Sequence, residues 1–272
     1  MKKILTFSFA IFFTSCVNNS EAKFWLNGDL SDGDYIQWSG DNTLANEMIF
    51  FGINHNYNFE RAKALTFFET ALKYDPSLFG PHVMIASLVF PDSEKQKYHV
   101  KKAKELVVDN NETSKLFVSL LDLEKKPGWP FYTDEANKIW SKMRDIEPKG
   151  KLIHFYYAFS LTELEEQISA FEELKDELIE NNLQLSMVPA INNVLAYLYY
   201  DNGKKDKSKL LFDDYIKNYT EGYNPYDSMG EYFMKEGDLE ESLKYYQKAV
   251  QNFPYGNGAI QSVREIREKL NN

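Results

Sequence analysis

The sequence has 272 residues, a formal net charge of −10, 43% hydrophobic residues and 15% aromatic residues. A chain of this length and apolar content can bury a sizeable core, which argues against an intrinsically disordered protein. The acidic balance disfavours nonspecific nucleic-acid binding and broad contact with anionic lipid, because both need basic patches.

The chain opens with the pattern of an export signal. Lys2 and Lys3 precede an apolar run, residues 4–13, that is too short to span a bilayer, and small residues follow it. A charged start, a short apolar core and small residues are typical of a secretory signal peptide, which we place at residues 1–15. The next residue, Cys16, is the only cysteine of the chain, so it has no internal disulfide partner.

This arrangement resembles the lipobox of bacterial lipoproteins, in which the cysteine is lipidated and becomes the first residue of the mature protein. The resemblance implies lipidation of Cys16 and attachment to a membrane through the acyl chains of that residue. It also implies a place in the bacterial cell envelope, at the outer rather than the inner membrane, with the soluble part in the periplasm or at the cell surface. An ordinary signal peptide followed by an incidental cysteine is the alternative.

Residues 16–44 combine a polar tether with an aromatic segment rich in aspartate and glycine. The aspartates and glycines lack the ligand spacing of an EF-hand, so they indicate turns and no metal site. We expect the apolar residues of this segment to pack on the first helical unit and to cover its open end. They are Phe24, Trp25, Tyr35, Ile36 and Trp38.

From about residue 45 onward, apolar residues recur at steps of three and four, which predicts amphipathic helices. The clearest unit starts at Tyr223, where a first helix breaks at residues 236–238 and a second helix ends before Pro254. Gly230 and Ala249 are small at the points where the two helices must touch. This pattern resembles the tetratricopeptide repeat, a pair of helices with a period of about 34 residues.

The resemblance implies six such units, at residues 45–256, starting near residues 45, 79, 112, 151, 189 and 223. Two prolines and a glycine at residues 127–130 predict a lengthened turn in the third unit. A fourth unit of about four extra residues predicts one more helical turn in its second helix, residues 163–181. Residues 257–272 predict a capping helix with a polar face. The expected fold is an all-α, right-handed superhelical solenoid of about six helix pairs plus this C-terminal capping helix.

No catalytic or cofactor-binding pattern is present in the sequence. The four histidines, His55, His82, His99 and His154, fall in different units and lack the spacing of a zinc site. Phosphate-binding loops, dinucleotide-binding glycines and nucleophile elbows are missing, and an acidic run at residues 163–177 predicts a solvated helix face. We therefore expect no enzyme activity, no cofactor and no metal. The aromatic residues after Pro127 either tuck over a neighbouring unit or form a partner contact.

In tetratricopeptide proteins the first helix of each pair lines a concave groove that binds peptides or partner proteins. Chaperone-binding members hold a terminal carboxylate with lysine and asparagine, whereas the matching positions here are Ile49, Val83, Asn193 and Asp227, which do not support that specificity. The alternative for each groove position is surface or inter-repeat packing. The full set of groove candidates is Asn46, Ile49, Ile53, Asn56, Val83, Ser87, Asn193, Tyr197, Tyr200, Asp227, Glu231 and Met234.

These features predict a membrane-anchored adaptor or scaffold in the bacterial cell envelope. Its partners would be a protein or peptide in the groove and a membrane through the lipid anchor, with no nucleic acid. The alternative is an accessory lipoprotein that captures a ligand, such as a glycan, through Trp25, Trp38 and Trp129. Tryptophans stacked on an open surface would favour ligand capture, and buried tryptophans beside a continuous empty groove would favour the adaptor.

Overall fold

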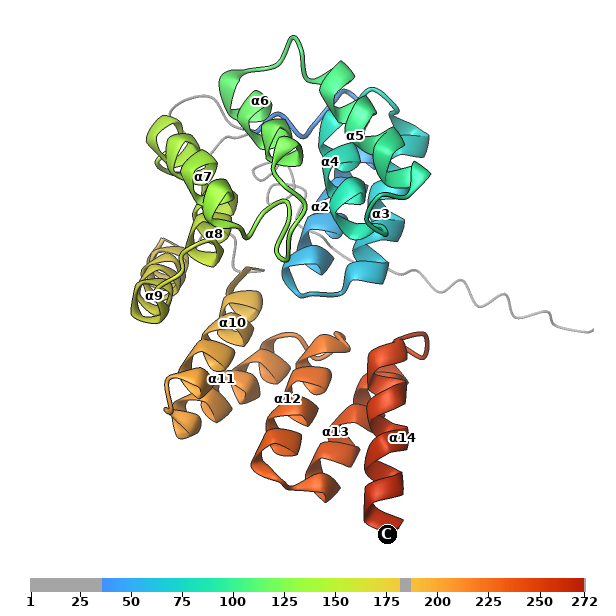
Figure 1. Ribbon diagram of the computed structural model, residues 1–272, viewed down its shortest axis with the longest axis vertical. Coiled ribbons are helices and arrows are strands. Elements are labelled where there is room, and N and C mark those ends of the chain that lie inside the picture. Colours follow the sequence, from blue (N-terminus) through green and yellow to red (C-terminus); the bar gives the residue numbers. More distant parts are fainter. Residues whose placement is uncertain (1–35, 182–186, 272) are drawn as a thin grey trace, which may run out of the picture.

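The computed structural model describes residues 36–181 and 187–271 of the chain. Every regular element in these residues is a helix, as Figure 1 shows. The predicted signal peptide, Cys16, and the aromatic residues Phe24, Trp25 and Tyr35 lie outside the described residues.

The helices follow one another as six pairs and a final helix, which confirms the all-α, tetratricopeptide-like fold. Figure 1 shows α10 to α14 grouped at one end of the molecule and α2 to α9 at the other. The pairs are α2 (Thr43–Tyr57) with α3 (Arg61–Tyr74), α4 (Phe79–Leu88) with α5 (Glu94–Leu106), α6 (Glu112–Ser119) with α7 (Asp134–Ile146), α8 (Lys151–Phe159) with α9 (Leu164–Glu180), α10 (Val188–Asp201) with α11 (Lys205–Asn218), and α12 (Asn224–Glu236) with α13 (Leu239–Asn252); the final helix is α14 (Asn257–Asn271).

Side-chain caps explain where several of these helices begin. Asn42, Ser93, Asn111, Thr133 and Asp238 each accept a hydrogen bond from the backbone amide three residues ahead. Each cap satisfies an amide that has no partner inside the helix, which stabilises the helix start by about 1 kcal/mol. At Ser93, a serine followed by charged residues is a sequence pattern typical of such a cap.

Small residues lie where the two helices of a pair cross. A Cβ atom added to Gly230 would lie 2.9 Å from the ring of Tyr246, and one added to Gly52 would lie 2.7 Å from the ring of Phe68. Ala249 is buried in a cluster with Tyr246, Ala259 and Ile266, next to the ring that faces Gly230. The close approach predicted from the sequence is present in the first and the last pair.

The third pair departs from the regular pattern. Helix α6 has only eight residues and continues as a 3₁₀ turn at Leu120–Asp122, before a loop leads to Thr133. Phe131 in this loop is buried and stacks on Phe117 at 5.8 Å between ring centroids, and its carbonyl accepts a hydrogen bond from Trp140 Nε1 at 2.9 Å. The loop aromatics thus tuck inward.

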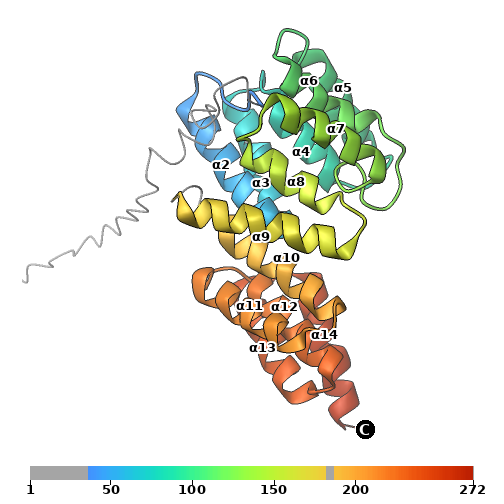
Figure 2. The same cartoon turned by 90° about the vertical axis from the view of Figure 1, so that its left-hand side faces the viewer.

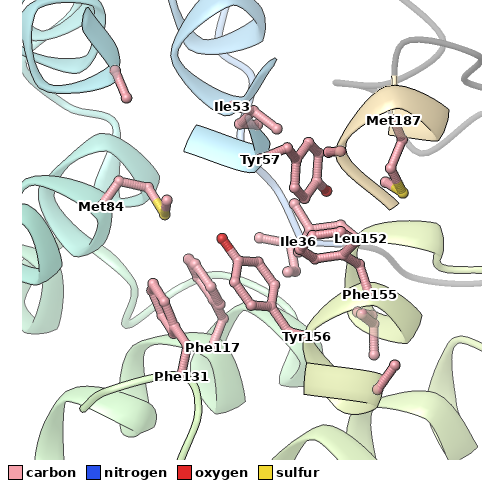
Figure 3. Close-up of a cluster of buried hydrophobic side chains, with 14 of the residues drawn as sticks. Ile36, Ile53, Tyr57, Met84, Phe117, Phe131, Leu152, Phe155, Tyr156 and Met187 are labelled. Carbon is pink, nitrogen blue, oxygen red and sulfur yellow. The ribbon is translucent and has the colours of Figure 1, made fainter. Parts of the chain in front are cut away.

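The first helix pair also packs against the fourth. Tyr57 of α2 lies 4.6 Å from Phe155 of α8, centroid to centroid, and Asn56 Nδ2 donates a hydrogen bond to Tyr156 Oη at 2.9 Å. Figure 3 shows side chains from α2, α6 and α8 pointing into one cluster between the pairs. The first four pairs therefore curl around a shared apolar core, where an open solenoid would leave a groove.

The segment before α2 contributes to this core. Ile36 and Trp38 are buried, Trp38 lies 4.9 Å from Phe117 between ring centroids, and the Gln37 amide donates to Ser114 Oγ at 2.9 Å. Trp38 departs from the expected packing on the first unit, because it lies against Gly80 of the second pair and Phe117 of the third. Figure 3 shows Ile36 beside Tyr57 of the first pair and Leu152 of the fourth.

Candidate partner-binding face

Four of the twelve groove candidates are buried in the fold. Ile49 and Val83 have no exposed surface, and Ile53 and Asn193 are only 3% exposed. The prediction that these side chains line an accessible groove is corrected: Ile49, Ile53 and Val83 belong to the core around which the first four pairs curl, and Asn193 is buried within α10 of the fifth pair. Residues around them on α4, from Phe79 to Ala86, are buried as well.

Three further candidates are half-buried and already bonded within the chain. Asn46 exchanges two hydrogen bonds with the backbone of Gly40, at 3.0 and 2.9 Å. Asn56 is held by Tyr156, as described above, and Ser87 Oγ donates to the carbonyl of Met84 at 2.7 Å. These hydrogen bonds give the three side chains a role in holding the fold together.

The remaining five candidates come together on two neighbouring first helices, α10 and α12. We call this group the α10–α12 face, and its members are Tyr197, Tyr200, Asp227, Glu231 and Met234. All five are half-buried. Tyr197 Oη donates to Glu231 Oε2 at 2.8 Å, so one repeat is joined to the next at equivalent positions.

Charged side chains from α11 and α12 border this face. Lys235 Nζ pairs with Glu231 Oε1 at 2.8 Å and lies over the rings of Tyr197 and Tyr200, at 5.3 and 5.4 Å from their centroids. Glu236 accepts hydrogen bonds from Tyr200 Oη at 2.7 Å and from Lys205 Nζ at 2.7 Å. The face therefore presents aromatic rings between fixed charges, an arrangement suited to peptide contact.

Asp227 differs from the other carboxylates of the face. Desolvation by burial and the neighbouring charge of Glu231 raise the pKa of Asp227 from 3.8 to about 6. No lysine or arginine of the described chain forms an ion pair with it. Burial also raises the pKa of the Tyr197 phenol well above 10, so this hydroxyl stays a hydrogen-bond donor.

A second cluster, which sequence reasoning missed, joins the first pair to the turn between α11 and α12. Glu60 has no exposed surface. Its Oε2 atom lies 2.7 Å from His55 Nδ1 and accepts hydrogen bonds from Lys63 Nζ at 2.9 Å and from Tyr219 Oη at 3.0 Å. Its Oε1 atom accepts a hydrogen bond from the Tyr223 amide at 2.7 Å. We call these five residues the Glu60 latch.

Electrostatics favour the charged form of Glu60. Burial alone would raise the pKa of this carboxyl, but the hydrogen bonds from His55, Lys63 and the Tyr223 amide outweigh burial and lower it. Tyr215 also donates to the carbonyl of Asn58 at 3.3 Å. The tyrosines at 215, 219 and 223 are spaced by four residues, and this stripe is the one sequence signal that could have indicated a contact here.

Among the described helices, none has both the length and the hydropathy that a membrane span requires. Within residues 36–181 and 187–271, no group of three or more metal-ligating side chains is arranged around a common point. Trp38 and Trp140 are buried and Trp129 is half-buried, so these tryptophans form no stacked open surface.

Known proteins resemble this chain in fold only. No family model and no curated protein matches the sequence. Among solved structures, yeast Tom70 is 15% identical over 91% of this chain and 53% of its own, with a TM-score of 0.46. The Cut9–Hcn1 hetero-tetramer of the APC/C is 11% identical over 82% of this chain and 42% of its own, with a TM-score of 0.43.

A tetratricopeptide protein of Thermus thermophilus is 16% identical over 82% of this chain and 98% of its own, with a TM-score of 0.36. The chain spans about half the length of yeast Tom70 and less than half that of the Cut9–Hcn1 match. At these identities and scores the likeness concerns the fold alone, and the fold assignment rests on the helix pairs themselves.

Proposed function

We propose that the chain is an adaptor of the bacterial cell envelope, attached to a membrane through a lipid on Cys16, that holds a protein or peptide segment on the α10–α12 face. The observation that carries this proposal is the difference in burial and position among the twelve groove candidates. Four of the twelve are buried in the fold, whereas five half-buried candidates lie on two adjacent helices that the hydrogen bond between Tyr197 and Glu231 joins.

The chemistry of the face favours a peptide-like partner. Tyrosine and methionine offer a large contact area, and a few tyrosine or arginine anchors carry most of the binding energy in protein interfaces. Tyr197 packs edge-on against Phe212 at 5.0 Å between ring centroids, so part of its ring already belongs to the fold. Tyr200 likewise packs edge-on against Tyr232 at 5.8 Å between ring centroids, and Met234 packs against the cluster around Tyr246, so the exposed parts of these two side chains are the surface that we propose a partner contacts.

The alternative of ligand capture by tryptophans receives no support from the described residues. Trp38 stacks inside the core, and Lys125 Nζ lies 5.6 Å from the centroid of the half-buried Trp129 ring. The adaptor reading fits these positions better, because no described tryptophan lies on an open surface and two half-buried tyrosines lie on α10.

The experiment compares partner recovery by the lipid-anchored protein and two variants, each purified from membrane extracts. We expect Tyr200→Ala with Met234→Ala to lower the recovery of the specific partner at least about tenfold, since loss of an interface anchor costs about 2 kcal/mol. Leu210→Ala, at an exposed position on α11, is the matched control and should recover the partner normally. Undiminished recovery by the double variant, with a normal melt, would exclude the α10–α12 face as the binding site.

A further inference from the structure

A cleft of about 510 Å³ lies between α7, α8 and α9, and none of the five residues of the α10–α12 face lines it. Figure 2 shows these three helices next to one another on the side that faces the viewer. The floor of the cleft is apolar and consists of Leu161, Ala170 and Leu174, whereas its walls are mainly polar. Its volume falls in the range of small-molecule sites, which is roughly 300–1,000 Å³.

One wall presents an arginine without an acidic partner. The guanidinium carbon of Arg144 lies 3.9 Å from the centroid of the Tyr157 ring. Stacking of this kind occupies the flat face of the guanidinium and leaves its N–H edges free for a carboxylate. No aspartate or glutamate of the described chain pairs with Arg144, although the sequence has 41 acidic residues.

The same wall holds a neutral histidine with a spare acceptor. Burial, followed by the charges of Arg144 and Lys151, lowers the pKa of His154 to about 4, so its ring is neutral at physiological pH. One ring nitrogen hydrogen-bonds the backbone of Pro148, while the Nε2 atom is buried and has no hydrogen-bond partner in the described chain. Such an atom costs stability unless a donor reaches it.

The opposite wall, from α9, is acidic. Glu166 and Glu173 lie two helical turns apart along α9 and both line the cleft. Glu173 accepts a hydrogen bond from Ser169 Oγ at 3.1 Å, and Glu177 pairs with Lys151 at the edge of the cleft. Neither Glu166 nor Glu173 forms an ion pair with a lysine or arginine of the described residues.

We propose that this cleft binds a small zwitterion, with its carboxylate on Arg144 and its ammonium group on Glu166 and Glu173. His154 lines the same cleft, and its neutral ring adds no positive charge beside the ammonium group. A simple anion would leave the glutamates unmatched, and a simple cation would leave Arg144 unmatched. A free amino acid and a short peptide share the required chemistry, and both fit a volume of 510 Å³. This inference is independent of the α10–α12 face.

Isothermal titration of the full chain in detergent micelles tests the proposal with leucine, glutamate and dileucine as zwitterions. N-acetyl-leucine and leucine methyl ester serve as probes that each lack one of the two charges. We expect at least one of the three zwitterions to bind with a Kd of about 1 mM or tighter. Each of the two leucine derivatives should bind at least about tenfold more weakly than leucine. Failure of all three zwitterions to bind at about 10 mM, or equal binding of both leucine derivatives and leucine itself, would overturn the proposal.

Variants locate the binding within the cleft. Arg144→Gln and the double variant Glu166→Gln/Glu173→Gln should each weaken zwitterion binding at least about tenfold, while Arg264→Gln on the exposed face of α14 should leave it unchanged. The glutamates are exposed, so their replacement tests the site even if Arg144→Gln loosens the packing on Tyr157. Unchanged affinity in the double glutamate variant would show that the zwitterion binds elsewhere.

Discussion

Glu60 is the residue on which the closure of the molecule depends most. It is fully buried, and its two carboxylate oxygens have four partners from the first pair and from the α11–α12 turn. A buried carboxylate of this kind is tolerated only because its partners compensate for lost hydration. Removal of the charge leaves these partners buried and poorly matched.

We therefore expect Glu60→Gln to lower the free energy of unfolding by on the order of 2–3 kcal/mol. The measurement is urea denaturation followed by circular dichroism. Glu221→Gln is the matched control, because Glu221 is an exposed carboxylate in the same α11–α12 turn. Equal stability of Glu60→Gln and the parent would mean that the latch contributes nothing to closure.

The buried histidine pair of the second helix pair predicts a loss of stability in acid. His82 Nδ1 and His99 Nδ1 lie 2.7 Å apart, and burial, aided by neighbouring charges, lowers the pKa of each ring from 6.5 to about 4. The unfolded chain thus binds these protons at a higher pH than the folded chain does. The neutral histidines make their full contribution to the free energy of unfolding above pH 6.5, and this contribution falls as the pH drops toward 4. The loss is about 1.4 kcal/mol for each tenfold difference in proton affinity between the folded and the unfolded chain.

Asp227 acts in the opposite direction over part of this range, because its pKa is raised to about 6. The histidine contribution is therefore isolated by comparing thermal melts of the parent and His82→Leu/His99→Leu at pH 7 and pH 5. We expect the double variant to lose clearly less stability between the two pH values. The same loss in both proteins would assign the pH dependence to other groups.

Cys16 alone is expected to carry the membrane attachment. We expect Cys16→Ala to leave the protein unprocessed or to release it into the soluble periplasmic fraction, because no other cysteine can be lipidated. Cell fractionation with immunoblotting distinguishes these outcomes. A variant that remains in the membrane fraction after removal of its signal peptide would place the anchor elsewhere.

At the scale of single elements, the sequence predicts the helices and their crossings well. Steps of three and four residues and the small residues Gly52, Gly230 and Ala249 depend only on neighbouring helices, so they can be recognised in the sequence. The short α6 and its 3₁₀ continuation could not be predicted in this way. Its end is determined by Phe131 and Trp140, which fill the space that a longer helix would occupy.

Overpacking of the last crossing should destabilise the C-terminal end first. Ala249 packs in a small cluster with Tyr246, Ala259 and Ile266, separate from the main core. We expect Ala249→Leu to lower stability by roughly 1–3 kcal/mol, with hydrogen exchange rising first in α12 to α14. Gln251→Leu, at an exposed position of the same helix, should melt like the parent. An unchanged melt of Ala249→Leu would contradict the crossing at Ala249.

At the scale of the whole molecule, the sequence predicts the stack of pairs and not its curvature. Repeat patterns report contacts between successive units, whereas Asn56 meets Tyr156 and Glu60 meets Tyr223 across about one hundred residues or more. The irregular third pair and the buried Trp38 segment shape the curl that makes these contacts possible. For that reason several inner positions of the first two pairs became core or structural contacts, whereas five candidates on α10 and α12 stay half-buried on adjacent helices.

The most direct test of this conclusion compares two positions for which the repeat pattern alone predicts equal contact with a partner. A photo-reactive benzoylphenylalanine is placed at Met234, on the α10–α12 face, or at Ser87, a groove candidate on α4 that is also half-buried. Each protein is irradiated in intact membranes and its covalent adducts are compared by mass spectrometry. We expect a specific partner adduct from Met234 and none from Ser87. An adduct of that partner at Ser87, with none at Met234, would contradict restriction of binding to the α10–α12 face.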